Sequence, residues 1–81
     1  MTHITPHLAF VREQGRVIYF TADLPVFAHD VTDHASFLMI NAQFHVNGHA
    51  RQSQIVSPFG LPSITLKRAV KRFREQGVAG F

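Results

Sequence analysis

The sequence predicts an α+β fold, in which an N-terminal β-hairpin is followed by a three-helix bundle. Residues 8–21 are rich in Val, Ile, Phe and Tyr on both sides of Gly15, which is typical of two strands joined by a tight turn. Further along the chain, apolar residues recur at spacings of three and four, which is typical of amphipathic helices. The 81 residues have the length of one small domain, so we treat residues 1–81 as a single domain.

The expected hairpin pairs residues 8–12 with residues 16–21, and Gly15 can take the positive φ that a tight turn needs. An isolated hairpin is weak in water, so one of its faces should cover the helices or a second subunit. The second strand is apolar on both faces: Val17 and Tyr19 lie on one face, and Ile18 and Phe20 lie on the other. Pairing with the same element of another copy, as a homodimer, therefore stays open beside a simple covering role.

Residues 22–30 are expected to connect the hairpin to the helices, so that residues 1–30 form the hairpin and its connector. Pro25 has no backbone N–H and is expected to break regular strand pairing. Phe27 lies two residues later and is expected to fill part of the core.

The tri-helical part is expected to span residues 33–77, and its first helix residues 33–46. Asp33 or Thr32 can accept hydrogen bonds from the free N–H groups of the first turn. The dipeptide Asn47-Gly48 is a usual stop, because both residues tolerate the left-handed conformation.

The second and third helices are expected to meet at a tight turn at Gly60. The second covers residues 51–59, and the third runs from near Pro62, whose fixed φ suits a helix start, to Gly77. A tight corner between two crossing helices needs a residue that tolerates positive φ and apolar side chains that close it from within. Suitable residues stand at each of these positions: Ile55, Phe59, Leu61, Leu66 and Ala69. The pattern predicts a helix-turn-helix.

The charge is distributed unevenly. The chain carries a net charge of +3, but residues 1–50 hold two basic and four acidic residues, whereas residues 51–81 hold six basic residues and one acid. Such segregation favours a polyanion as partner for the C-terminal part. A basic face that is merely solvated is the alternative.

The outward face of the third helix is the candidate DNA-binding surface. Five residues are expected to face base edges in the major groove: Ser63, Ile64, Lys67, Arg68 and Lys71. Four are expected to face phosphates: Gln52, Ser53, Arg72 and Arg74.

Residues 51–77, "RQSQIVSPFGLPSITLKRAVKRFREQG", resemble the helix-turn-helix of bacterial insertion-sequence transposases and related transcription regulators. The matching positions are Gln52, Ile55, Phe59, Gly60, Leu61, Thr65, Leu66 and Arg68. The resemblance implies specific binding of double-stranded DNA, as a transposon-end-binding domain or a small regulator. The few scattered acids do not form an acidic catalytic centre of the transposase type, so we expect no enzymatic activity.

Other classes of function are weighed against this one. The chain has no cysteine, which excludes disulfides, Zn-thiolate sites and thiol catalysis. One cluster could hold zinc, although a capped helix start is the more common role of such residues: His29, Asp30, Asp33 and His34. A protein-interaction or dimerisation module without specific DNA binding is the alternative function. We expect no cofactor and no metal.

No stretch approaches the roughly 18 apolar residues of a membrane span, and no secretory signal is recognisable. We therefore expect a cytoplasmic protein associated with the bacterial nucleoid.

Overall fold

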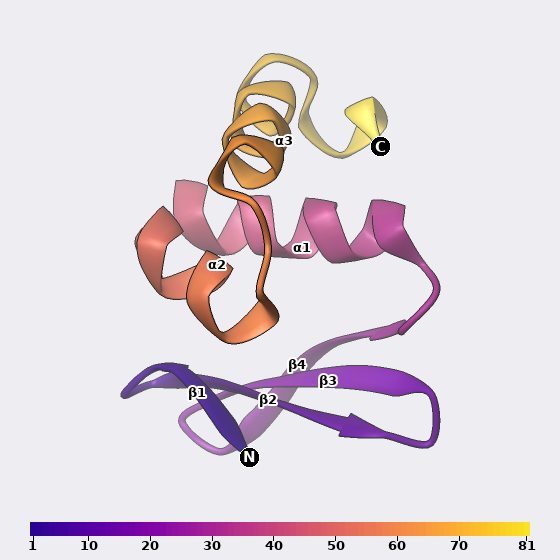
Figure 1. Cartoon of the computed structure of the whole chain (residues 1–81), viewed down its shortest axis with the longest axis vertical. Coiled ribbons are helices and arrows are strands. Elements are labelled where there is room, and N and C mark those ends of the chain that lie inside the picture. The colour runs from indigo at the N-terminus through magenta and orange to yellow at the C-terminus, as the bar shows by residue number, and fades with distance from the viewer.

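Four antiparallel strands form the N-terminal part of the chain and three α-helices form the rest (Figure 1). The computed structural model describes all residues, 1–81. In chain order, the elements are β1 (Thr2–Thr5), β2 (Leu8–Glu13), β3 (Arg16–Thr21), β4 (Leu24–Asp30), α1 (His34–Val46), α2 (Gln52–Phe59), α3 (Ser63–Gln76) and a 3₁₀ turn, η1 (Gly77–Gly80). The strands are neighbours in sequence order, and all three helices lie on one side of the sheet. The α+β class is therefore confirmed.

The sheet has four strands where the sequence predicted two. β1 pairs with β2, and β4 pairs with β3, so residues 22–30 contain a fourth strand where only a connector was expected. Regular pairing is interrupted at Pro25, as predicted. Pro25 stands opposite Phe20 while Phe27 stands opposite Tyr19, so Val26 is an extra residue in β4. This bulge absorbs the proline, whose missing N–H is tolerated because β4 is an edge strand.

Two tight turns join the three longer strands. Gln14 and Gly15 connect β2 to β3 with φ of 52° and 77°, as a two-residue hairpin with positive φ at both positions requires. Ala22 and Asp23 connect β3 to β4 in the same way, with φ of 48° and 66°. The first turn was expected from Gly15, and the second was not expected.

The helices begin and end close to the expected residues. Asp33 caps α1, because its carboxylate accepts hydrogen bonds from the backbone N–H of Ser36 at 3.1 Å and from the Ser36 hydroxyl at 2.7 Å. These bonds hold the pKa of the Asp33 carboxyl below its usual value. α2 ends at Gly60, which is left-handed with φ of 63°, and the N–H of Leu61 donates to the carbonyl of Val56 at 3.1 Å.

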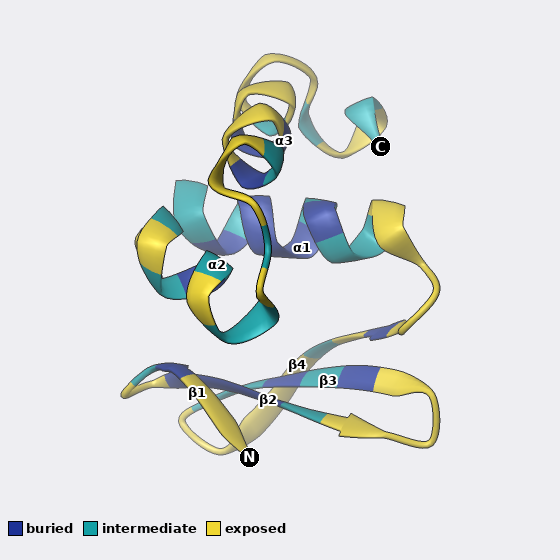
Figure 2. Cartoon of the chain, viewed as in Figure 1, coloured by how far each residue is buried: buried dark blue, intermediate teal, exposed yellow.

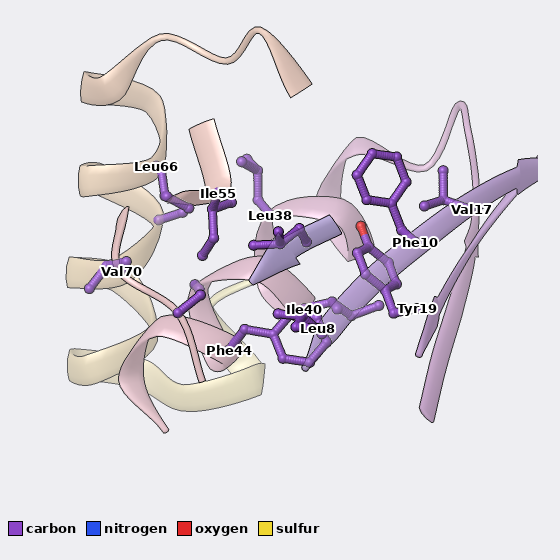
Figure 3. Packing of buried hydrophobic residues seen from close by; sticks show 14 residues of the cluster. Leu8, Phe10, Val17, Tyr19, Leu38, Ile40, Phe44, Ile55, Leu66 and Val70 are labelled. Atoms are coloured by element: carbon purple, nitrogen blue, oxygen red, sulfur yellow. The ribbon is translucent and has the colours of Figure 1, made fainter. Parts of the chain in front are cut away.

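The core extends from the inner face of the sheet, through α1 and α2, to the inner side of α3, which packs on the two other helices (Figure 2). Figure 3 shows its largest members, which come from every layer: Leu8, Phe10, Val17 and Tyr19 from the sheet, Leu38, Ile40 and Phe44 from α1, Ile55 from α2, and Leu66 and Val70 from α3. Phe59 joins α2 to the sheet, because its ring stacks on Phe10 with centroids 4.3 Å apart. Phe27 packs against this core at its edge, with its ring against Phe44.

Candidate nucleic-acid interface

The inner face of α3 determines how the helix is held. Leu66, Ala69 and Val70 are buried, and α3 packs on α1 and α2 through them. Ile55 of α2 is fully buried beneath the turn, and Phe59 and Leu61 on either side of Gly60 pack against the core. The apolar positions that the sequence assigned to this corner therefore all point inward, and the opposite side of α3 is directed away from the rest of the molecule (Figure 2).

The outer face of α3 presents all five residues that were expected to face bases. These residues are exposed: Ser63, Ile64, Lys67, Arg68 and Lys71. Ile64 is 51% exposed and places an apolar group one turn before the cations. We call these five residues the α3 outer face.

The cations of α3 have no acidic partner. The chain has one ion pair, and it lies elsewhere, between Arg16 and Asp30 at 4.0 Å. Glu75 is the only acid of α3 and stands one turn after Lys71, yet the two side chains are not paired. The helix carries five cations and one acid, and none of the cations is paired, so the positive potential on this side is reduced only by Glu75.

The two arginines expected at phosphates lie on opposite flanks of the α3 outer face. Arg72 stacks on the ring of Phe81, with its guanidinium carbon 5.1 Å from the ring centroid. The turn after α3 supports it closely, since a Cβ atom added to Gly80 would lie 2.8 Å from Cγ of Arg72. Arg74 is exposed and has no such contact. Arg72 therefore contacts the C-terminal turn, although it is exposed, whereas Arg74 makes no such contact.

The two candidates at the start of α2 also differ. Ser53 is exposed in the first turn, but Gln52 is half-buried and its side-chain nitrogen lies 3.5 Å from Nε2 of His45. The other ring nitrogen of His45 donates to the carbonyl of Ala50 at 3.0 Å. Gln52 thus contributes to the connection between α1 and α2, and Ser53 is the more accessible of the two.

In the cluster considered for zinc, the side chains of His29 and Asp33 make hydrogen bonds within the chain. His29 is 5% exposed and Nδ1 lies 2.8 Å from the carbonyl of Asp30, so Nδ1 is the donor. Nε2 then accepts from the Tyr19 hydroxyl at 2.8 Å, and that oxygen accepts from the side-chain amide of Asn41 at 2.9 Å. Asp33 caps α1. No group of three or more His, Asp or Glu side chains is arranged to hold a metal.

Sequence reasoning missed Arg12 and the polar trio Tyr19, His29 and Asn41. Arg12 lies on the inner face of the sheet, with its guanidinium 5.5 Å from the ring of Phe10 and 5.8 Å from the ring of Phe59. Because residues two apart on a strand lie on the same face, the apolar Phe10 could have indicated that Arg12 also lies on the inner face of the sheet.

None of the helices combines the length and the apolar composition that crossing a bilayer requires. Comparison of the chain with protein-family models, with curated proteins and with solved structures finds no match.

Proposed function

We propose that α2 and α3 form a helix-turn-helix, and that the chain binds double-stranded DNA in a sequence-specific way with α3 in the major groove. One observation carries the proposal: the α3 outer face holds Lys67, Arg68 and Lys71 in the open, with no acid of the chain paired to any of them. Cations that neutralise phosphates and release counterions are the main source of affinity for DNA.

The dimensions of α3 agree with this role. Its 14 residues span about 21 Å, and the major groove of B-form DNA is wide enough for an α-helix. In the helix-turn-helix arrangement, the N-terminal residues of the second helix contact base edges. Arg68 and the two lysines can pair with guanine O6 and N7, and Ile64 can contact a thymine methyl group.

The flanking residues are assigned to phosphates, which position a protein on DNA without reading its sequence. Arg74 and Ser53 are the strongest candidates, because both are exposed and uncommitted. Arg72 would reach a phosphate from beside the ring of Phe81. The resemblance to transposases and regulators favours a non-enzymatic transposon-end-binding domain or a small regulator, located at the bacterial nucleoid.

The test compares two variants on a DNA site selected from random sequences and on an unrelated duplex. Arg68→Ala should weaken binding to the selected site by about 1–3 kcal/mol and should affect the unrelated duplex less. Arg74→Ala should weaken binding to both and lower the salt slope by about one. Fluorescence anisotropy at two salt concentrations measures both effects.

Arg16→Ala is the matched control, because Arg16 lies in the sheet and is paired with Asp30. It should leave the affinity for both duplexes unchanged. Equal, sequence-independent losses from Arg68→Ala and Arg74→Ala would refute the assignment of roles, and affinity that does not change with salt would refute DNA binding itself.

The uncovered face of the sheet supports a second candidate, a protein-interaction or dimerisation module. Val11, Ile18 and Ala28 stand opposite one another across three strands, on the face that no helix covers, and Phe20 lies on the same face. A homodimer through this sheet would bury these side chains. Light scattering at low and high salt detects such a homodimer, because association through an apolar face does not weaken as salt rises. The second candidate is favoured over the first if the chain associates in this way and the anisotropy titrations show no salt-dependent binding of DNA.

A further inference from the structure

A cavity of about 200 Å³ opens between the inner face of the sheet and the helical layer, beside the α2–α3 turn. Five of its eight lining residues are hydrophobic, among them Val31, Phe37, Phe59 and Leu61, and polar and apolar atoms share its surface about equally. The rings of Phe37 and Phe59 meet edge to face, with centroids 4.9 Å apart, and Val31 is 52% exposed at the rim. An apolar protein cavity of about 150 Å³ is known to accept benzene, so this one has room for a single ring and a small substituent.

One lining residue, Arg12, is positively charged at every ordinary pH. Arg12 lies at the cavity with its guanidinium over Phe10 and Phe59, and no carboxylate of the chain is paired with it. Aromatic rings leave the in-plane N–H groups of a guanidinium free to donate. The cavity therefore places aromatic and aliphatic side chains beside a set of unused donors that suits a carboxylate.

His29, the other polar lining side chain, does not compete for such a ligand. Both of its ring nitrogens are engaged, Nδ1 with the carbonyl of Asp30 and Nε2 with the hydroxyl of Tyr19. It presents a ring and no free donor to the cavity. A matching ligand thus needs one negative charge, for Arg12, and an apolar body for the remaining wall.

We propose that this cavity binds a small monoanion in which one aromatic ring carries one carboxylate. The ring lies against Phe37, Phe59 and Leu61, and the carboxylate accepts from the fork of Arg12. The proposal goes beyond DNA binding and does not depend on it, since no cation of α3 lines the cavity.

Titration of the full chain with benzoate, followed by ¹H–¹⁵N NMR, tests the site in the absence of DNA. Benzoate should shift the backbone amides of Val31, Gly60 and Leu61, with a Kd in about the millimolar range for so small a ligand. Benzamide has the same ring without the charge, and acetate has the charge without the ring. Both should bind about tenfold more weakly or worse.

Two arginine variants locate the charge. Arg12→Gln should reduce benzoate affinity about tenfold and bring it to the level of benzamide. Arg16→Gln, in the same hairpin but paired with Asp30, should leave benzoate affinity unchanged. Arg12 is exposed, so its variant should stay folded, which the dispersion of the same spectra verifies. The proposal is overturned if benzoate shifts only amides along α3, if it shifts none, or if benzamide binds equally well.

Discussion

The buried polar trio of Tyr19, His29 and Asn41 and the outer face of α3 differ in where their polar groups find partners. In the core, the Tyr19 hydroxyl donates to His29 and accepts from the side-chain amide of Asn41, and of the polar side-chain atoms of this trio only Oδ1 of Asn41 has no partner. On the α3 outer face, Lys67, Arg68 and Lys71 are exposed and unpaired. Internal pairing of buried groups stabilises a fold because an unpaired buried group is costly. Exposed charges without internal partners stabilise little and are available to another molecule.

The contrast recurs within α3 itself, between adjacent residues. Leu66 is fully buried and Lys67 is exposed, although one peptide bond joins them. If the comparison is correct, changes on the inner side of the helix should alter stability, and changes on the outer side should alter binding without altering stability.

The largest effect is expected from Leu66→Ala, which removes a side chain that is 0% exposed at the contact of α3 with the core. Loss of buried methyl and methylene groups and the cavity left behind should lower the free energy of unfolding by about 2–5 kcal/mol. Lys67→Ala is the matched control and should stay within about 0.5 kcal/mol of the parent protein. Urea titration followed by circular dichroism measures both. Leu66→Met, with a smaller expected loss, provides the measurement if Leu66→Ala does not fold. Equal losses at positions 66 and 67 would break the comparison.

A slightly smaller effect is expected on the sheet side at alkaline pH. Burial raises the pKa of the Tyr19 phenol from 10.0 to about 12, against the opposing influences of the Asn41 hydrogen bond and the Arg12 charge. The folded state thus holds the phenol proton more tightly than the unfolded state, and this stabilisation is fully present below pH 10. Between pH 10 and pH 12 it should be lost, lowering the free energy of unfolding by about 3 kcal/mol.

The measurement is direct because Tyr19 is the only tyrosine and the chain has no tryptophan. The ultraviolet absorbance of the phenolate should titrate near pH 12 in the folded protein and near pH 10 in urea. In Tyr19→Phe the tyrosine contribution to the alkaline loss of stability should disappear. At neutral pH this variant should be less stable by about 1–3 kcal/mol, because it leaves Nε2 of His29 without a donor and removes one of the two hydrogen bonds of the Asn41 amide, which keeps its bond to the carbonyl of Phe37. A phenol that titrates at the same pH in both states would contradict the buried network.

The helical part of the fold could be predicted from the sequence because its signals are local. Asp33 caps α1, Gly60 ends α2 and Pro62 precedes α3, and each acts on its own backbone or on the next turn. The exposure of the α3 outer face followed from the same 3.6-residue period. These features depend on few contacts with distant residues, so one sequence was enough to place them.

The sheet was harder to predict because strand pairing is a contact between distant segments. β4 contains Pro25, and the turn before it, Ala22-Asp23, carries none of the glycine or asparagine that marks a two-residue hairpin. The polar partners of the core were missed for the same reason, since Asn41 and Tyr19 are 22 residues apart. The position of Arg12 at the cavity likewise depends on how β2 and α2 meet.

The smallest expected effect concerns the turn between β3 and β4, in which Ala22 has a backbone conformation that alanine does not favour. Ala22 has a φ of 48°, in the left-handed region that costs an ordinary residue about 1–2 kcal/mol. Asn tolerates this region better, so Ala22→Asn should raise the free energy of unfolding by about 0.5 kcal/mol. Ala22→Val should lower it, since a β-branched side chain is least suited to positive φ. Urea titration should place the free energy of unfolding of Ala22→Asn above that of the parent protein and that of Ala22→Val below it. The difference between the two variants is larger than either shift alone and is therefore easier to measure. If both variants lost stability equally, the β3–β4 turn would differ from the one described, and the sheet side would contain a feature that its internal contacts do not explain.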